Sequence, residues 1–329
     1  MKYFTAVLCA GQGAQTVGMG RDLAESFPEC RALFAKANEV LGYDLQKIIF
    51  EGPEEELTKS NHCQPAVFTV TAACFQALKI QCRALTVKAS AGLSLGEWTA
   101  LHLAGAITFE DGLRVLAARG RYMQEACEEQ EGAMVSVIGL ASDKLREIAA
   151  QSGVEIANYN SPEQIVLSGR KQNILEAEKM AKGSGAKRAI LLNVAGAYHS
   201  LLMKSAGEKM NTLLAGILLE QPRFPVMSNV TGRPHGSPEE IKQNMVRQVT
   251  SSVKWVDCVQ SLEKLGVNSY LECGPGRVLS GLVKRNQPQV KLCNVQNCQS
   301  LNATVTVLSA DLSFPCLPAA GQVKWESRY

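Results

Sequence analysis

The 329-residue chain lacks the features that mark several large classes of protein. It has no block of lysine and arginine residues, and its 34 basic and 31 acidic side chains leave a net charge of only +3. Nucleic acids and anionic lipid surfaces are bound by concentrated positive charge, so we expect neither as a partner. No stretch approaches the roughly 18 apolar residues of a membrane span, and we expect no membrane association.

The cysteine spacings typical of a zinc site or a disulfide framework are missing too. The 11 cysteines are odd in number, lie among apolar residues and include no Cys-x-x-Cys pair. Reduced core cysteines of a cytoplasmic protein have this distribution, so we expect neither a metal site nor a disulfide framework. The apolar run at residues 4–10 is short for the core of a secretory signal, and we interpret it as a buried first strand.

Short apolar runs alternate with longer helical patterns, which is typical of an α/β fold with a parallel sheet. In the first part of the chain we expect strands at residues 4–9 and 85–91, and helices at residues 20–41, 66–84 and 97–106.

The pattern changes near residue 131, where shorter units follow one another. They predict, in chain order, a strand at 133–140, a helix at 142–151, strands at 154–158 and 164–168, a helix at 172–182 and a strand at 187–193. The order βαββαβ is that of a small ferredoxin-like domain.

We therefore expect a large, discontinuous α/β domain over residues 1–130 and 198–296, with the ferredoxin-like domain inserted at residues 131–197. After about Asn297 the pattern fades, and we assign neither structure nor role to the tail at residues 297–329.

The pentapeptide from Gly92 to Gly96 has Ser94 at its centre and lies between a predicted strand and a predicted helix. Gly-x-Ser-x-Gly in this setting forms a nucleophile elbow, in which small residues are needed because the turn is sharp and the serine is strained. A helix start beside Ser94 would favour the oxyanion that forms when the serine attacks a carbonyl. Such a pentapeptide arises by chance in about one chain in ten of this length, so an incidental turn serine is the alternative.

A serine nucleophile needs a base, and the chain has four histidines. His199 stands between a Gly/Ala segment and an amphipathic helix, where the helix dipole would keep its imidazole neutral and able to accept a proton. A capping histidine is the alternative. We expect His102 to be packed or on the surface of its helix, and His62 and His235 to be solvated in turns.

Arg119 lies in a predicted helix with two other arginines that have local partners. Glu110 stands four residues before Arg114, and Glu125 stands four residues after Arg121, so both pairs suit ion pairing on a solvated face. The neighbours of Arg119 at the same spacing are apolar or aromatic. A buried arginine needs a carboxylate, and it can come either from elsewhere in the fold or from a substrate.

The loop Gly11-Gln12-Gly13-Ala14-Gln15 follows the first predicted strand. Position 16 is threonine where a dinucleotide fingerprint needs glycine, and the Gly-Lys-Ser/Thr of a P-loop is missing, so nucleotide binding is disfavoured. Exposed amides in such a loop are suited to donating a hydrogen bond to an oxyanion.

Taken in order, these segments resemble the malonyl-CoA:acyl-carrier-protein transacylase family, which includes the acyltransferases of polyketide assembly. The resemblance covers residues 1 to about 290 and rests on seven ordered groups of motifs: Gly11 to Met19, Gln64-Pro65-Ala66, Gly92 to Glu97, Arg119-Gly120 with Met123 to Ala126, Asn160-Ser161-Pro162, Ala197 to Ser200, and Gln248 ahead of Val253-Lys254-Trp255 with Gly274-Pro275-Gly276. It implies a hydrolase-like α/β core with a short parallel sheet and an inserted ferredoxin-like domain.

The resemblance also implies the roles of individual residues. Ser94 would take the acyl group and His199 would be its general base. Arg119 would pair with the malonyl carboxylate through two hydrogen bonds. The amides of Gln12 and Leu95 would form the oxyanion hole. Gln248 stands where the family orients the histidine.

The reaction that follows is a ping-pong transfer of malonyl from malonyl-CoA, through Ser94, to the phosphopantetheine thiol of an acyl carrier protein in fatty-acid or polyketide synthesis. We expect no cofactor, because the phosphopantetheine belongs to the partner. We also expect no metal and a monomer. Two positions bear on the acyl group: Leu93 replaces the histidine of most members, and Tyr198 leaves less space for a branched acyl group than a small residue would, which favours malonyl.

Two alternatives use the same residues differently: a hydrolase that releases acyl groups from carrier proteins, and a non-catalytic docking subunit. The buried charge of Arg119 argues against the hydrolase, and the pairing of Ser94 with His199 argues against the docking subunit. Arg277, Lys284 and Arg285 follow the last Gly-rich turn and would suit CoA phosphates or an acidic carrier protein, with solvated surface residues as the alternative.

Overall fold

The computed structural model describes residues 5–311. None of the helices in this range is both long and apolar enough to cross a membrane. The elements are, in chain order, β1 (Thr5–Cys9), α1 (Arg21–Ser26), α2 (Pro28–Leu41), α3 (Leu45–Glu51), α4 (Glu54–Thr58), α5 (Ser60–Gln81), β2 (Val87–Gly92), α6 (Leu95–Leu103), α7 (Phe109–Glu129), β3 (Gly132–Ile138), α8 (Ser142–Ser152), β4 (Glu155–Ser161), β5 (Gln164–Arg170), α9 (Lys171–Gly183), β6 (Arg188–Leu191), the 3-10 turn η1 (Leu201–Met203), α10 (Lys204–Ala215), α11 (Pro238–Gln248), α12 (Trp255–Lys264), β7 (Ser269–Cys273), α13 (Val278–Asn286), β8 (Lys291–Val295) and α14 (Cys298–Asp311).

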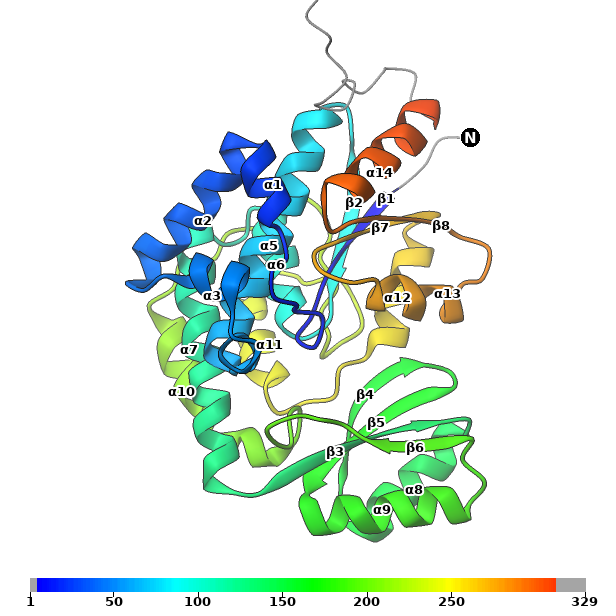
Figure 1. The fold of residues 1–329 in the computed structure, drawn as a ribbon. Helices are drawn as coiled ribbons and strands as arrows, with labels where there is room; N and C mark the ends of the chain where they lie inside the picture. Colours follow the sequence, from blue (N-terminus) through cyan, green and yellow to red (C-terminus); the bar gives the residue numbers. More distant parts are fainter. Residues whose placement is uncertain (1–4, 312–329) are drawn as a thin grey trace, which may run out of the picture.

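The first sheet is short and parallel, with strand order β2-β1-β7-β8. All five residues of β1 are buried and the last four are apolar, as is typical of a strand with both faces covered. Successive side chains of a strand point to opposite faces. Accordingly, Val7 and Cys9 join one apolar cluster with α5 and α7, whereas Ala6 and Leu8 join another with α12 and α13. The sheet is therefore the middle layer between two groups of helices (Figure 1).

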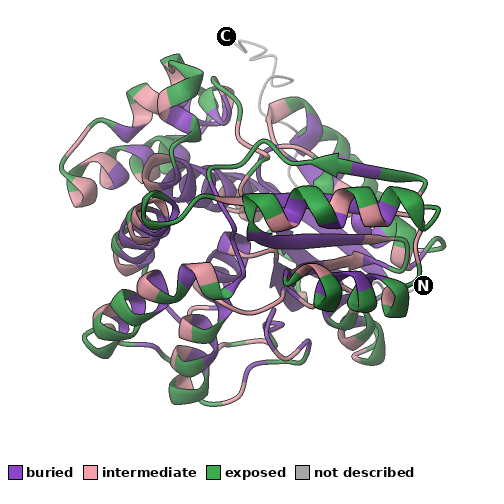
Figure 2. Cartoon of the chain, turned by 90° about the horizontal axis from the view of Figure 1, so that it is seen from below, coloured by how far each residue is buried: buried purple, intermediate pink, exposed green. Residues whose placement is uncertain are grey.

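The second sheet is antiparallel, with strand order β4-β5-β3-β6, and it lies beside the first as a separate layer (Figure 1). Helices α8 and α9 pack on it around a third apolar cluster that includes Val135, Leu145 and Ile174. Buried residues line the inner sides of the helices and both sheets, while exposed residues cover the outer sides (Figure 2). The predicted fold class, α/β with a parallel sheet and a βαββαβ unit, is confirmed. The proposed domain boundaries stay a prediction.

Several elements differ from the sequence prediction. The helix expected at residues 20–41 is two helices, because Phe27 adopts an extended conformation before Pro28 and thus ends α1. Helix α5 begins at Ser60, six residues before the helix we expected at 66–84. The stretch after Asn297, to which we assigned no structure, contains α14, whose Leu301 and Leu308 are buried against the core. Residues 312–329 of the tail lie outside the described residues.

Nine cysteines of the described chain are free thiols, and seven of them are buried. Burial raises the pKa of the thiols of Cys30 and Cys63 to about 12, so they stay protonated and behave as small core residues. Cys82 is the exception, because its sulfur is disulfide-bonded. The expectation of reduced cysteines therefore holds for these nine and is wrong for Cys82, which has no spacing signal in the sequence.

Candidate active site

Ser94 forms a strained turn between β2 and α6. Its φ of 56° is in the left-handed region that non-glycine residues avoid. The turn brings the chain so close to itself that a Cβ on Gly92 would lie 2.0 Å from the main-chain carbon of Gly96. A Cβ on Gly96 would lie 2.2 Å from the main-chain oxygen of Cys9 in β1. Both glycines of the motif are thus required by close approach, as expected for a nucleophile elbow.

Asn229 holds this turn from the side. Its Oδ1 accepts a hydrogen bond from the main-chain N of Ser94 at 2.7 Å, and its Nδ2 donates to the main-chain oxygen of Gly92 at 2.8 Å. Asn229 is fully buried. The sequence offered no signal for it, because it stands in an irregular segment 135 residues away from Ser94.

His199 faces the serine. Its Nε2 lies 2.8 Å from Ser94 Oγ, and its Nδ1 lies 2.9 Å from the main-chain oxygen of Gln248. A carbonyl oxygen only accepts, so Nδ1 carries the proton and Nε2 is free to accept the proton of the serine hydroxyl. Burial, and secondly the charge of Arg119, lower the pKa of His199 to about 4. The imidazole is therefore neutral near pH 7, as expected, but burial and Arg119 are the causes, and the helix dipole is not needed.

Arg119 is the third polar group at the serine. It is only 1% exposed, and its Nη2 donates to Ser94 Oγ at 2.9 Å. Nη2 also donates to Gln248 Oε1 at 3.0 Å, and Nη1 donates to Gln64 Oε1 at 2.8 Å. Nε has no partner, and among residues 5–311 no carboxylate forms an ion pair with this guanidinium. Burial lowers the pKa of Arg119 to about 10, which still leaves it charged at neutral pH.

Gln248 connects the arginine to the histidine. Its main-chain oxygen accepts from His199, while its side-chain oxygen accepts from Arg119. Its Nε2 donates to the main-chain oxygen of Ser94 at 3.0 Å and to Glu97 Oε2 at 2.6 Å. The residue contacts the histidine, as the resemblance implies, and the contact is made by its main-chain oxygen. The link to Arg119 was missed, and so was Gln64, although both residues stood in the motifs that carried the resemblance.

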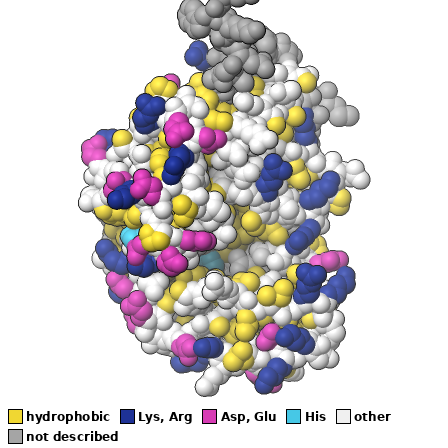
Figure 3. Space-filling view, in the orientation of Figure 1, with side chains coloured by type: hydrophobic (Ala, Val, Ile, Leu, Met, Phe, Trp, Pro, Cys, Tyr) yellow, Lys and Arg dark blue, Asp and Glu magenta, His cyan; other side chains and the backbone are white. Residues whose placement is uncertain are grey.

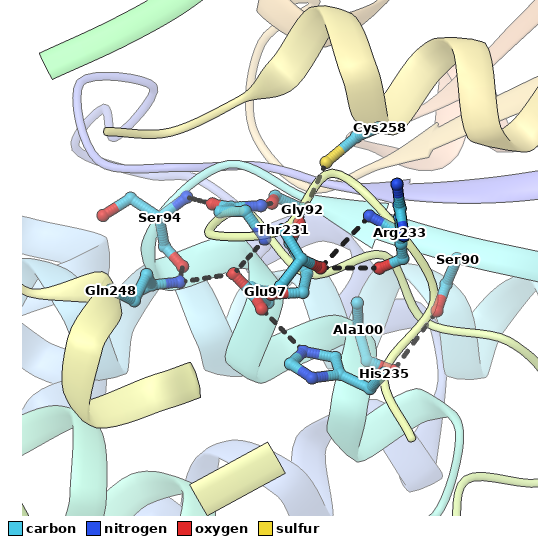
Figure 4. A network of polar contacts seen from close by, with 12 residues as sticks. Ser90, Gly92, Ser94, Glu97, Ala100, Thr231, Arg233, His235, Gln248 and Cys258 are labelled. Carbon is cyan, nitrogen blue, oxygen red and sulfur yellow. Dashed lines mark hydrogen bonds and ion pairs between the residues drawn. The ribbon is translucent and has the colours of Figure 1, made fainter. Parts of the chain in front are cut away.

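Glu97 and His235 form a buried pair behind this group (Figure 4). The Nε2 of His235 lies 2.7 Å from Glu97 Oε1, and neither side chain is exposed. Our expectation that His235 is solvated is therefore wrong. Its neighbours Pro234 and Gly236 are typical of a surface turn, but the segment pairs with the chain at Val226 and Met227 and lies over α6.

The proposed oxyanion donors follow neighbouring strands. Gln12 comes after β1 and Leu95 comes after β2, and these strands are paired in parallel up to Cys9 and Gly92. The carboxyl ends of parallel strands meet at one edge of a sheet, which is where Ser94 also lies. Leu95 is the first residue of α6, so its amide has no acceptor within the helix. The oxyanion role of both amides stays a prediction.

A cavity of about 450 Å³ opens above Ser94 and His199. Residues of both sheet regions line it, among them Gln12 and Leu93 from the first, Met134 of β3 and Asn158 of β4. The surface is hollowed between the two parts of the molecule, with hydrophobic side chains along the hollow (Figure 3). Leu93 and Tyr198, the two positions expected to affect the acyl group, both line this cavity.

Two further histidines and two arginines considered in the sequence are not among the residues that line this cavity. The ring of His102 contacts Phe68 and Phe109, and its Nδ1 is bonded to the oxygen of Ile107, which fits the packed role expected. His62 is partly buried against Glu56, so our expectation that it is solvated is wrong. Arg114 pairs with Asp111 in place of Glu110, and Arg121 pairs with Glu125 as predicted.

The three basic residues after the last Gly-rich turn lie on or near α13. Arg277 donates to Asn294 Oδ1 at 3.3 Å, and the exposed Arg285 donates to Gln164 Oε1 at 2.6 Å. Lys284 contacts the main-chain oxygen of Pro288. Within the described part of the chain, no three His, Cys, Asp or Glu side chains gather where they could hold a metal ion.

Comparison with known proteins agrees with this arrangement. The family model described as "Acyl transferase domain" matches residues 7–301. The malonyl CoA-acyl carrier protein transacylase of Bacillus subtilis is 37% identical over 311 residues, which are 93% of this chain and 98% of the relative. The crystal structure of the transacylase of that name from Clostridium perfringens matches with a TM-score of 0.90 and 37% identity, covering 94% of this chain and 98% of that one.

A third match is a type II polyketide synthase acyl-carrier protein in complex with its malonyl-transacylase. It has a TM-score of 0.86 and 39% identity, and the match covers 91% of this chain and 97% of that chain. All three matches extend over nearly the whole sequence, so they concern the complete fold and not one motif. The chain belongs to the acyl transferase domain family and, within it, to the malonyl-CoA:acyl-carrier-protein transacylases.

Proposed function

We propose that this protein transfers a malonyl group from malonyl-CoA to the phosphopantetheine thiol of an acyl carrier protein, through an ester on Ser94. The observation that carries the proposal is the position of Arg119, whose Nη2 lies 2.9 Å from Ser94 Oγ. A buried cation without a carboxylate partner, placed at a nucleophile, suits an acyl group that brings its own carboxylate. The names of the relatives and the carrier-protein complex agree with it.

In the first half of the reaction, Ser94 Oγ attacks the thioester carbonyl while its proton passes to His199 Nε2. The carbon–sulfur bond breaks, and the CoA thiolate takes the proton from His199 as it leaves. In the second half, the carrier thiol gives its proton to His199 and attacks the ester on Ser94. The carbon–oxygen bond breaks, and Ser94 recovers the proton.

Arg119 would select the acyl group. Its planar guanidinium matches the two oxygens of a carboxylate, and its Nε has no hydrogen-bond partner among residues 5–311. An acetyl group would leave the buried charge unpaired, which disfavours acetyl-CoA. Leu93 and Tyr198 in the same cavity would limit the space beside the acyl chain.

The amides of Gln12 and Leu95 would stabilise the negative oxygen that forms on the carbonyl. The start of α6 adds the positive end of its dipole at the same place. Both donors are main-chain amides, so the fold fixes them before the substrate binds.

A hydrolase that releases acyl groups from carrier proteins is the second candidate, because it would use the same serine and histidine. Arg119 argues against it, since an apolar acyl chain leaves that charge unpaired. The two functions can be distinguished by incubating the protein with acyl carrier protein that carries either malonyl or a saturated acyl group. A transferase moves malonyl between thiols and releases little free acid, whereas rapid release of free acid from either carrier would favour the hydrolase.

Mass spectrometry of the intact protein tests the main proposal. After mixing with malonyl-CoA, acetyl-CoA or methylmalonyl-CoA, we expect one malonyl group on the wild-type protein and none on Ser94→Ala. Addition of holo carrier protein should remove the group and label the carrier. Absence of malonyl on Ser94 would refute the acyl-enzyme, and loading by acetyl-CoA at an equal rate would refute the selection by Arg119.

A further inference from the structure

Glu97 is a fully buried carboxylate with no part in the proposed reaction. It lies three residues after Ser94, in the first turn of α6. Three donors surround it: the Nε2 of His235 at 2.7 Å from Oε1, and the Nε2 of Gln248 at 2.6 Å and the main-chain N of Asn229 at 3.0 Å from Oε2. Figure 4 shows Glu97 with His235 and Gln248. These contacts connect Glu97 to the Asn229 that holds the elbow, to Gln248 and to His235.

The contacts of Glu97 determine which way the Gln248 amide faces. The Nε2 of Gln248 donates to a carboxylate oxygen of Glu97 and to the main-chain oxygen of Ser94, and both atoms can only accept. The amide oxygen is therefore on the opposite side, where it accepts from Arg119 Nη2. The reversed amide would set oxygen against two acceptors and an NH₂ group against a guanidinium, which can only donate.

The orientation of Gln248 in turn affects the arginine. Arg119 Nη2 is shared between Gln248 Oε1 and Ser94 Oγ, so the amide oxygen holds the guanidinium beside the nucleophile. A donor in place of that oxygen would push the guanidinium away. Gln248 is fully buried, so water cannot replace the lost partner.

We propose that Glu97 is a positioning residue for acyl-group selection: by accepting from Gln248 Nε2, it presents the Gln248 amide oxygen to Arg119 and so keeps the guanidinium in place for the substrate carboxylate. This inference rests on the proposed malonyl transfer. The hydrogen bond from Gln248 Nε2 to Glu97 orients the amide, and the negative charge of Glu97 is secondary.

Two near-isosteric variants separate the contact from the charge. Glu97→Gln removes the charge but can keep an oxygen toward Gln248 and Asn229, while its NH₂ group faces His235 Nε2, which accepts in the other imidazole tautomer. Glu97→Asp keeps the charge but is one methylene shorter and withdraws the oxygen from Gln248. Glu272→Gln is the matched control, because Glu272 is equally buried but accepts from the amides of Leu279 and Ser280 at α13.

The measurement is kcat/KM for malonyl-CoA and for acetyl-CoA with each folded variant, checked by circular dichroism. For Glu97→Asp we expect the preference for malonyl to fall about tenfold, the size of one lost hydrogen bond, through a higher KM for malonyl-CoA. For Glu97→Gln and Glu272→Gln we expect the preference to stay within about threefold of the wild type.

Three outcomes would overturn the inference: an unchanged preference in Glu97→Asp, a loss of preference in Glu97→Gln equal to that in Glu97→Asp, or an equal loss for both substrates. Equal loss is what a purely structural role would cause. If Glu97→Asp does not fold, a loss of preference in Glu97→Gln still refutes the inference. A wild-type protein that fails to load malonyl refutes the proposed function itself, and the inference with it, whereas an unchanged preference in Glu97→Asp refutes the inference alone.

Discussion

The Nε2 of His199 lies 2.8 Å from the Oγ of Ser94, although the two residues are 105 positions apart. They are also the two non-glycine residues with positive φ in the described chain, at 58° and 56°. Strain of this kind persists only where surrounding contacts hold it, and here Asn229 holds the serine while the Gln248 carbonyl holds the histidine. The nucleophile and its base are therefore positioned by separate parts of the chain.

Replacement of Arg119 by alanine should lower kcat/KM for malonyl-CoA about a hundredfold or more, because truncating one partner of a buried charge pair costs about 2 to 5 kcal/mol. Acetyl transfer should rise, since the buried charge that penalises acetyl is removed. Arg119→Lys should lose most of the malonyl activity as well, because an ammonium lacks the planar pair of donors. Steady-state assays with both thioesters check this, and unchanged selectivity in Arg119→Ala would remove Arg119 from the acyl-binding site.

The rate of serine acylation should stay high as the pH falls to about 5.5 and decline only toward pH 4, because His199 must be neutral to act as a base and its pKa is lowered to about 4. In Arg119→Ala the acid limb should move to higher pH, since the arginine charge contributes to that lowering. Acetyl-CoA loading by both proteins, followed across the pH range, measures the shift. If the acid sides of the two pH–rate profiles coincide, either His199 is not the base or its pKa does not depend on Arg119.

The same pKa shift predicts how stability depends on pH. His199 titrates near 6.5 when unfolded and near 4 when folded, so the unfolded state binds the proton first as the pH falls. The contribution of the neutral histidine is complete above about pH 6.5 and is lost toward pH 4. Urea unfolding of wild type and His199→Gln should show a smaller decline in the free energy of unfolding for the variant over that window.

Replacement of Asn229 by alanine should lower the free energy of unfolding by about 2 kcal/mol, because it leaves the Ser94 amide and the Gly92 carbonyl without their partner in a buried site. Acylation should slow as well, since the elbow loses the contact that holds Ser94. The exposed Asn302 on α14 offers a control, and Asn302→Ala should melt like the wild type. Equal melting temperatures for both variants would show that Asn229 does not support the turn.

Replacement of Gly92 by alanine should prevent the elbow from forming, because its Cβ would lie 2.0 Å from the main-chain carbon of Gly96. We expect a protein that is insoluble or melts at a much lower temperature. In contrast, a Cβ at Gly281 in α13 meets no atom within 4 Å, and Gly281→Ala should gain about 0.5 to 1 kcal/mol of helix propensity. Thermal melts of the two alanine variants compare these expectations directly, and a stable Gly92→Ala would contradict the geometry of the turn.

Reversal of charge at the exposed Arg285 should raise the KM for the carrier protein without changing the rate at which malonyl-CoA loads Ser94, if the basic residues of α13 meet an acidic carrier. Lys36→Glu on α2 carries the same charge change on another helix and serves as the control. An equal effect of both variants would assign the result to net charge, and no effect of either would leave Arg285 as a solvated surface residue.

The local features of this protein could be predicted because they depend on neighbours in the chain. The elbow at Ser94 needs glycines two residues away on either side. The α/β class follows from the alternation of short apolar runs with longer helical patterns. The isolation of Arg119 was also visible, because its helical neighbours are apolar. These properties arise from steric limits and hydrophobic periodicity within about ten residues.

The errors arose where a distant segment decided the outcome. His235 stands in a sequence typical of a turn, yet Glu97 buries it, and the two are 138 positions apart. Asn229 has no motif at all, although it holds Ser94. The neutrality of His199 was predicted, but for a cause that the structure replaces with burial and the charge of Arg119.

By itself, the sequence determined the sharp turn that exposes Ser94, the layered α/β architecture and the need of Arg119 for an anion, because each follows from covalent geometry or from local side-chain chemistry. Only the tertiary structure decided that the histidine and the arginine meet at the Ser94 hydroxyl and that Gln248 contacts both of them. That meeting depends on the parallel pairing of β1 and β2 and on the path of the chain from α10 to α11, which no local pattern encodes.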